Sequence, residues 1–579
     1  MLRRSLLPVA ALALAAATAR ADISGHVLVE GSGVPGTPVP GAWVHLQGEP
    51  SPGVFAGAGG AFLLDVDPAG AVMVTASLPY SKGAPENFLI GGTYAVNGET
   101  GVEIRLVPLP AADQAGYEPP TFGVCAGCHT QQAADWQSSR HAFTASNAWV
   151  LDLHSGSGTP GGGAGYVFTA THDPGETGFC ATCHAPLADL AAGGTLQLDD
   201  PAMPIYGQEG VVCLACHQLS DVDATHLDAL HFRGKASYRF PADPDGETHL
   251  FVWGPLDDVT FGGMRPSHSP LHRSSLLCAS CHQYKNPDTG ASGQNTYGEW
   301  LASPFAAAGP GFRTCQDCHM PASEGTGQIC LFGGVDRPGV DRKHHTFVGS
   351  TPETMAANVG FTATAEQLER GLLEVTTAVD NFGAGHDFPT GVGVRNVIVL
   401  VEASIAGTPL LQVAGPTVPW WADDEVPGKQ PGDWAGLPGT GYAKVMAGRI
   451  NGTGPELKPV LFVDAERIDE NTQIHSGAIA TAGYRFELPA SVAPGTPIDV
   501  SARLVWRRVW RSFAVTKGWT TDVRGGPIEV ELHRVDLALP FEPIPPQEIP
   551  ALAPAGLALL TASLAAAALG RLRRKGRPR

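Results

Sequence analysis

Five copies of one short motif constrain this chain more than any other feature of its sequence. The pattern Cys-x-x-Cys-His recurs between residues 125 and 319. The five motifs comprise Cys125, Cys128 and His129; Cys180, Cys183 and His184; Cys213, Cys216 and His217; Cys278, Cys281 and His282; and Cys315, Cys318 and His319. Of the 11 cysteines in the chain, only Cys330 lies outside them. If the motifs hold cofactors, ten cysteines are used and no disulfide framework is available.

Cys-x-x-Cys-His is the attachment signature of c-type haem. The two thiols add across the haem vinyl groups, and the histidine that follows is held against one face of the iron. Paired cysteines also occur in zinc ribbons and dithiol redox centres, but neither alternative explains a histidine after every pair. With only 20 histidines in 579 residues, five such positions are not expected by chance. The sequence therefore predicts five covalently bound haem c groups.

The composition indicates several turn-rich domains and excludes one class of partner. A chain of 579 residues is too long for one hydrophobic core, so we expect two to four domains. Its 72 glycines and 49 prolines, with only 16% charged residues, favour β structure and irregular segments over long surface helices. The formal charge of −19 argues against nucleic-acid binding.

The N-terminal residues 1–21 are predicted to be a signal peptide. Arg3 and Arg4 precede an apolar run, and Ala19-Arg20-Ala21 provides a cleavage site with small residues. We therefore expect export to the periplasmic or cell-surface side of a bacterial membrane. The general secretory route is favoured over the twin-arginine route, because haem attachment resembles a process performed on unfolded chain after export.

The C-terminal residues 541–579 combine a proline-rich linker, an apolar segment and an arginine-rich tail. Residues 551–570 are long enough to span a membrane, and the basic end would stay in the cytoplasm. The arrangement resembles bacterial sorting signals of the PEP-CTERM kind, which implies a transient membrane anchor that is later processed. A permanent tail anchor is the alternative.

Three folded regions are predicted between these ends. Residues 22–110 show short apolar runs between turns, typical of a small antiparallel β-sandwich, and resemble carboxypeptidase-regulatory or fibronectin-like modules. Residues 111–355 contain all five motifs, and here we expect loops and short helices, with haem supplying much of the buried apolar surface. Residues 356–540 are predicted to form a second β-sandwich, with long strands at 394–405 and 497–509. The predicted fold class is therefore multidomain, ending in a single transmembrane or sorting helix.

The sixth position of each iron decides between an electron carrier and a catalyst. A second histidine gives a low-spin carrier, whereas an open position allows substrate to bind. Several histidines outside the motifs are candidates for this second ligand. They are His141, His268 or its neighbour His272, His345 or its neighbour His344, His386, and one of His231, His226 and His172.

Residues 111–400 resemble the multihaem cytochrome c family of the cytochrome c554 type. Besides the five motifs, the resemblance rests on Trp136-x-x-Ser139-x-His141, Cys315-Gln-x-Cys-His-Met-Pro321, His345-x-Phe-x-Gly349 and Gly385-His386-x-x-Pro-Thr-Gly391. It implies that His141, His345 and His386 are axial ligands, and it favours His268 over His272. With His231 chosen for the region after the third motif, the predicted distal ligands are His141, His231, His268, His345 and His386.

The sequence favours an exported pentahaem protein that transfers electrons between redox partners. Those partners would be cytochromes, quinol-linked donors or terminal reductases. The alternative is a multihaem oxidoreductase in which one open haem acts on a small nitrogen or sulfur compound. Ammonia-forming nitrite reductases use a Cys-x-x-Cys-Lys site, which does not occur in this sequence. A carrier is therefore expected rather than a catalyst, and no catalytic residue is assigned.

Overall fold

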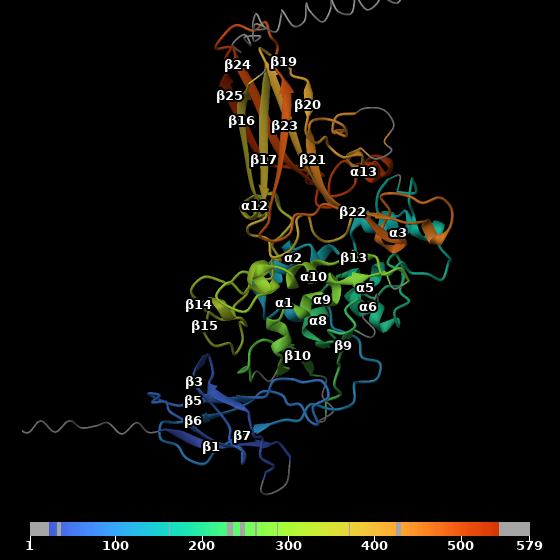
Figure 1. The fold of residues 1–579 in the computed structure, drawn as a ribbon. Helices are drawn as coiled ribbons and strands as arrows, with labels where there is room; N and C mark the ends of the chain where they lie inside the picture. Colours follow the sequence, from blue (N-terminus) through green and yellow to red (C-terminus); the bar gives the residue numbers. More distant parts are fainter. Residues whose placement is uncertain are drawn as a thin grey trace, which may run out of the picture.

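The computed structural model describes residues 22–31, 36–160, 162–228, 235–243, 249–260, 263–286, 288–369, 371–423, 426 and 430–543. The predicted signal peptide, the C-terminal tail beyond residue 543 and His231 lie outside these residues. None of the helices in the described ranges is long and apolar enough to cross a membrane. A β-rich domain lies at each end of the molecule, and the region containing the five motifs lies between them (Figure 1).

Two sheets form the N-terminal domain, one of three strands in the order β4-β1-β7 and one of four in the order β3-β2-β5-β6. The strands are β1 (Ile23–Val29), β2 (Trp43–Leu46), β3 (Glu49–Phe55), β4 (Ala61–Leu64), β5 (Val72–Ser77), β6 (Gly91–Ala95) and β7 (Val102–Leu106). Inward and outward residues alternate along β7, as expected for a strand with one buried face. The predicted sandwich was antiparallel throughout. The structure differs at β1 and β7, which pair in parallel. The strand before β7 is β6, which belongs to the other sheet, and the chain crosses from β6 to the free edge of β1.

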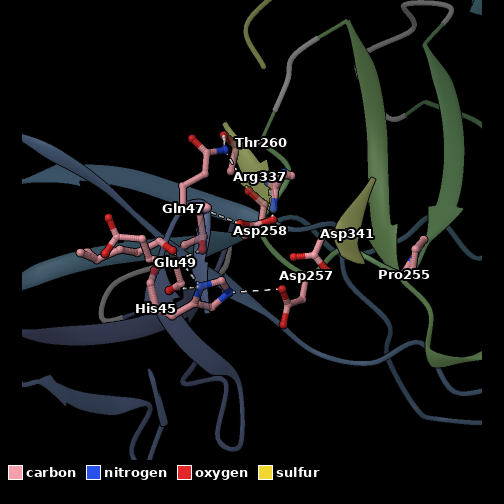
Figure 2. A network of polar contacts seen from close by, with 12 residues as sticks. His45, Gln47, Glu49, Pro255, Asp257, Asp258, Thr260, Arg337 and Asp341 are labelled. Atoms are coloured by element: carbon pink, nitrogen blue, oxygen red, sulfur yellow. Dashed lines mark hydrogen bonds and ion pairs between the residues drawn. The ribbon is translucent and has the colours of Figure 1, made fainter. Parts of the chain in front are cut away.

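Buried polar contacts attach this domain to the middle of the chain. Arg337 and Asp258 form an ion pair of 2.6 Å, and their side chains are 8% and 0% exposed. Asp258 also accepts a hydrogen bond of 2.7 Å from the backbone of Gly48. Beside it, His45 Nε2 on β2 lies 3.3 Å from Asp257 (Figure 2). The N-terminal domain is therefore a fixed part of the molecule.

Short helices and small sheets make up the middle region. The helices are α1 (Phe122–Ala126), α2 (Thr130–Ser138), α3 (Ala148–Ser155), α4 (Phe168–Thr171), α5 (Cys180–His184), α6 (Pro186–Ala191), α7 (Ile205–Gln208), α8 (Cys213–His217), α9 (Leu276–His282), α10 (Thr296–Leu301) and α11 (Cys315–His319). The paired strands are β8 (Leu219–Val222) with β9 (Ala236–Tyr238), β10 (Leu250–Gly254) with β11 (Met264–His268), β12 (Tyr284–Lys285) with β13 (Ser292–Gln294), and β14 (Thr326–Gly327) with β15 (Arg337–Pro338). Buried apolar side chains form three small separate clusters here, so the centre of the region is not filled by a core of its own.

The C-terminal domain packs two large sheets face to face, after helix α12 (Pro352–Asn358). One sheet has the order β16 (Gly360–Leu368), β17 (Leu372–Asp380), β23 (Ile479–Glu487) and β20 (Gln412–Ala414). The other has the order β22 (Arg467–Asn471), β21 (Gly439–Ala447), β18 (Asn396–Ile405), β24 (Pro497–Arg507) and β25 (Glu529–Pro540), with β19 (Thr408–Pro409) beside β18. The long strands expected at 394–405 and 497–509 correspond to the central pair β18 and β24. Val397, Val399 and Val401 of β18 are buried against Leu373 and Val375 of β17, and each such side chain contributes about 1.5–3 kcal/mol.

One end of the C-terminal domain faces the motif region (Figure 1). The connection between β17 and β18 spans residues 381–395, and the connection between β24 and β25, which contains α13 (Arg511–Lys517), spans residues 508–528. Residues from both connections line the same cavity as the motifs. The sandwich therefore supplies part of the wall around the motifs.

The ion pair of His45 with Asp257 makes the docking of the N-terminal domain depend on pH. Burial opposes the charged imidazolium, but the hydrogen bond and charge of Asp257 outweigh it, so the pKa of His45 is raised above 6.5. The pKa of Asp257 is lowered below 3.8, because contact with His45 outweighs its partial burial. The pair therefore stabilises the fold most between about pH 4 and 6.5, and this contribution is lost above the raised pKa of His45 or below the lowered pKa of Asp257.

We expect His45→Gln to reduce the free energy of unfolding of the N-terminal domain more at pH 6 than at pH 9. Urea titrations of both proteins at both pH values, followed by hydrogen exchange of β2 amides, measure this difference. His26, which is exposed on β1 of the same domain, provides the control, and His26→Gln should behave like the wild type. An equal loss of stability at both pH values would contradict the role of the charged pair.

Candidate cofactor site

A continuous cavity of about 1450 Å³ is lined by the cysteine and histidine side chains of the five motifs. All ten motif cysteines and all five motif histidines line it. The C-terminal domain contributes His386, Arg395 and Trp519 to the wall, and the N-terminal domain contributes Gln47. All eleven cysteines of the chain are free thiols. The cavity therefore lies where the region lacks a core, and its walls carry the reactive groups.

Local helical structure aims each motif at the cavity. Four motifs form single helical turns, α5, α8, α11 and the end of α9, and residues three apart on a helix lie on the same face. Thr314 and Asp317 form a capping box that fixes the start of α11. The first motif differs, because α1 ends at Ala126 and His129 precedes α2. In each motif the two thiols can thus reach one ligand from the same side.

Contacts at Nδ1 orient all five motif histidines. Four of them donate this N–H to a backbone carbonyl, and the fifth, His282, lies 2.9 Å from the side-chain amide of Gln294. The carbonyl acceptors are Ile329 for His129 at 3.2 Å, Thr144 for His184 at 2.8 Å, Trp253 for His217 at 2.8 Å, and Val348 for His319. Because a carbonyl only accepts, the proton of these four histidines lies on Nδ1 and the lone pair on Nε2. This is the arrangement by which second partners orient a metal-binding imidazole.

Five further histidines line the same cavity: His141, His154, His272, His345 and His386. Burial lowers the pKa of His141, His345 and His386 to about 4 and that of His272 to about 3. Burial also lowers the pKa of His154. All five are therefore neutral at pH 7 and keep a lone pair, as a metal ligand must.

Two of these histidines stand opposite motif histidines at a spacing that suits one metal atom. The rings of His319 and His386 are 6.3 Å apart and 8° from parallel, and those of His217 and His345 are 6.4 Å apart and inclined by 26°. Two metal–nitrogen bonds of about 2 Å, with about 1 Å from each nitrogen to its ring centre, give roughly 6 Å. Nδ1 of His386 donates to the carbonyl of Asp387 and Nδ1 of His345 to that of Lys343, which leaves Nε2 available in both.

The other three cavity histidines also present nitrogens toward the motifs. His141 lies close enough to His282 to lower the pKa of the latter, after the larger effect of burial. His272 donates Nε2–H to the carbonyl of Cys216 at 3.0 Å, while its buried Nδ1 makes no hydrogen bond. Neither ring nitrogen of His154 has a hydrogen-bond partner, although Asp199 lies 3.4 Å from Nε2. A buried nitrogen without a hydrogen-bond partner lowers the stability of the fold. Such nitrogens are suited to coordinate the iron of the predicted haem groups.

Three predicted distal ligands, His141, His345 and His386, line the cavity, whereas His268 does not. His268 ends β11 and lies near Asp257. Four residues later, a 3-10 helix over Pro270–Arg273 turns His272 into the cavity. His272, the alternative at this position, therefore lines the cavity, and the assignment of His268 as a ligand stays a prediction.

The candidates around His231 are placed elsewhere by the structure. His231 itself lies outside the described residues. His172 contacts Asp464 at 2.9 Å, and the side chain of His226 is 64% exposed. His344, the neighbour of His345, pairs with Asp135 at 2.8 Å. In each of His172, His226 and His344, a ring nitrogen is thus paired with a carboxylate.

Sequence reasoning missed His154 completely. It lies in the last turn of α3, where the side chains of both Asp152 and His154 are buried. The surrounding run Ala148–Leu153 is apolar except for Asp152. A histidine and an aspartate inside an apolar helix were the signal that could have identified a functional position.

Contacts between thiols show which motifs are neighbours. Hydrogen-bonding contacts join Cys125 to Cys213, Cys183 to Cys281, and Cys278 to Cys315. The last contact lowers the pKa of Cys315 to about 7. The first motif therefore lies beside the third, and the fourth lies beside both the second and the fifth. Five cofactors bound at these positions would form one contiguous group.

Comparisons with known proteins add a structural likeness. No protein-family model matches the chain, and no curated protein matches it. Among solved structures, the chain is similar to a penta-haem cytochrome c552 from Thermochromatium tepidum, with 21% sequence identity and a TM-score of 0.47. The match covers 72% of this chain and 99% of that chain. Because this likeness is weak, the description of the site rests on the residues of this chain.

A buried ion pair fixes α3, and with it His154, to the C-terminal domain. Lys517 Nζ of α13 lies 2.7 Å from Asp152 Oδ1, and the two side chains are 2% and 0% exposed. Trp519 donates its indole N–H to the other carboxylate oxygen at 2.7 Å, and its ring stacks on Trp149 at 4.5 Å. Both partners of Asp152 come from the connection between β24 and β25.

Asp152→Ala should lower the free energy of unfolding by about 3–5 kcal/mol, because it leaves the Lys517 ammonium buried without a counter-charge. Urea unfolding at neutral pH measures the change. Glu531→Ala, which removes one partner of the exposed pair with Arg534, is the matched control and should have little effect. A loss no larger than that of the control would show that the pair does not fix α3.

Proposed function

We propose that this protein is a pentahaem c-type cytochrome that transfers electrons between redox partners through closely packed, mainly bis-histidine haems. One observation carries the proposal: ten paired thiols, five motif histidines and five further neutral histidines face one cavity. Haem c, when bound there, supplies one-electron redox chemistry. The chain attaches it, orients its axial imidazoles and surrounds it with low-dielectric protein.

The ligand spacing supports an assignment of second histidines to motifs. We pair His386 with the fifth motif and His345 with the third, from their ring spacings. His141 is assigned to the fourth motif, because its charge lowers the pKa of His282 after the larger effect of burial and the fifth motif already has His386. His154 is assigned to the second motif, because α3 packs with Cys180 in one apolar cluster. His272 is left for the first motif, because His345 already stands opposite His217 of the third. The ring of His272 also lies 5.5 Å from that of His217, and Cys213 of the third motif contacts Cys125 of the first.

A carrier is favoured over an enzyme by the number of second histidines. Five candidate histidines for five motifs allow each iron to be six-coordinate, which suits electron transfer rather than substrate binding. The alternative, an oxidoreductase acting on a small nitrogen or sulfur compound, requires one of these histidines to stay away from its iron. The partners we propose are other redox proteins: cytochromes, quinol-linked donors or terminal reductases.

Export to the periplasmic or cell-surface side of a bacterial membrane is part of the proposal. It is supported by the predicted signal peptide at residues 1–21. The apolar segment at 551–570 and the arginine-rich tail after it support at least transient anchoring in that membrane.

The purified holoprotein should have the mass of the processed chain plus five haem groups. Its oxidised spectrum should be entirely low-spin and unchanged by cyanide, and its reduced spectrum should be unchanged by carbon monoxide. Intact-mass spectrometry and electron paramagnetic resonance measure these properties, with a Cys278→Ala, Cys281→Ala double variant as the control that lacks one haem. A bare-chain mass would refute covalent haem. A high-spin haem that binds cyanide would instead support the enzyme.

Replacement of His272 by Ala should convert one of the five haems from low-spin to high-spin, because its iron loses the second imidazole. The matched control is His268→Ala, four residues away, which should leave all five haems low-spin. His386→Ala should produce the same single conversion at a different haem. A high-spin signal in His268→Ala with none in His272→Ala would reverse the assignment of this ligand.

A further inference from the structure

Three arginines converge in the cavity wall beside the C-terminal domain. Arg140 precedes the predicted ligand His141, Arg395 ends the connection between β17 and β18, and Arg508 follows β24. All three line the cavity. Burial, followed by the charges of Arg140 and Arg508, lowers the pKa of Arg395 to about 10. Three positively charged side chains are thus presented to the same cavity.

Among the ion pairs of these three arginines, Asp522 is the shared carboxylate. Asp522 Oδ2 lies 3.1 Å from Arg140 and 3.1 Å from Arg508. Arg395 donates to the carbonyl of Thr390 at 3.1 Å, and no carboxylate of the described residues forms an ion pair with it. The group of Arg140, Arg395, Arg508 and Asp522 thus carries a net charge of about +2. Arg508 is only 10% exposed, and excess charge of one sign at such a position is costly without a counter-ion.

The location of the excess charge indicates the kind of counter-ion. Arg395 ends the same connection between β17 and β18 that carries His386, and Arg140 directly precedes His141. These two histidines serve the fourth and fifth motifs in the proposed function. Arginine forks bind carboxylates through paired, charge-assisted hydrogen bonds. A carboxylate carried into the cavity at either motif would therefore meet an unpaired guanidinium.

We propose that Arg140, Arg395 and Arg508 form an anion site for the propionate carboxylates of the haem groups at the fourth and fifth motifs. The inference rests on the proposed function, which places haem at these motifs. It assigns to the C-terminal domain the neutralisation of haem charge, in addition to the ligand His386. Positive charge beside an iron stabilises its reduced form, which carries one positive charge fewer, so the site raises the reduction potential of the nearest haem.

A redox titration of the holoprotein, followed by absorbance, tests this role. Arg395→Gln should lower the potential of one haem, so that the ratio of reduced to oxidised haem at fixed potential falls on the order of tenfold. Arg395→Lys keeps the charge and should restore most of this ratio. Arg140→Gln, at a half-exposed position, should lower the same potential and decides the test if Arg395→Gln does not fold. The matched control is Arg485→Gln, since Arg485 pairs with Glu374 on the exposed face of the sandwich and should leave all potentials unchanged.

Two results would overturn the proposal. One is unchanged potentials in both Arg395→Gln and Arg140→Gln. The other is a shift of the wild-type potentials on adding acetate or nitrite at constant ionic strength, which would show that the arginines bind free anions instead of haem carboxylates. Intact-mass spectrometry of each variant separates these outcomes from failure of the proposed function: five haems with unchanged potentials refute the anion site alone, whereas a bare-chain mass refutes the function.

Discussion

The structure depends on buried imidazoles whose nitrogens are left without protein partners. A neutral histidine in an apolar wall loses its hydrogen bonds to water, and each such group costs about 1–3 kcal/mol unless something replaces them. His154 and His272 carry nitrogens in this state, around a cavity lined by ten thiols. The protein therefore places strong donors around a space where it provides no core. Cofactor bound there would satisfy the nitrogens and fill the space together.

Both flanking domains contribute to this arrangement, by different physical means. The N-terminal domain docks through polar contacts: Gly48 donates to Asp258, which is itself paired with Arg337, and His45 lies beside Asp257. The C-terminal domain extends two connections into the cavity wall, one carrying His386 and the other carrying Lys517 and Trp519. Its own core of packed strands keeps these connections in place. At Gly383 the first connection passes so close to α12 that a Cβ would lie 2.5 Å from Asn358 Oδ1.

The motif residues could be predicted from the sequence because their chemistry depends on local spacing. Cys-x-x-Cys-His places its groups on one helical turn whatever the rest of the chain does. The second histidines depend on tertiary structure, so their prediction relied on the resemblance of short segments. That resemblance selected His141, His345 and His386, which line the cavity, and it favoured His268, whereas a 3-10 turn places His272 in the cavity wall. His154 lies in no such segment, and its burial depends on an aspartate clamped by Lys517, 365 residues away in the sequence.

The connection between β17 and β18 has a consequence for how the chain divides into parts. The last motif ends at His319, but the imidazole opposite it belongs to residue 386. Under the proposed function, the motif region and the sandwich would be separate as folds but inseparable as a redox unit. A gene fragment ending after the fifth motif would then encode five attachment motifs but only part of the proposed coordination sphere. Exchange of the sandwich between related proteins would change the environment of the last proposed haems without altering any attachment motif.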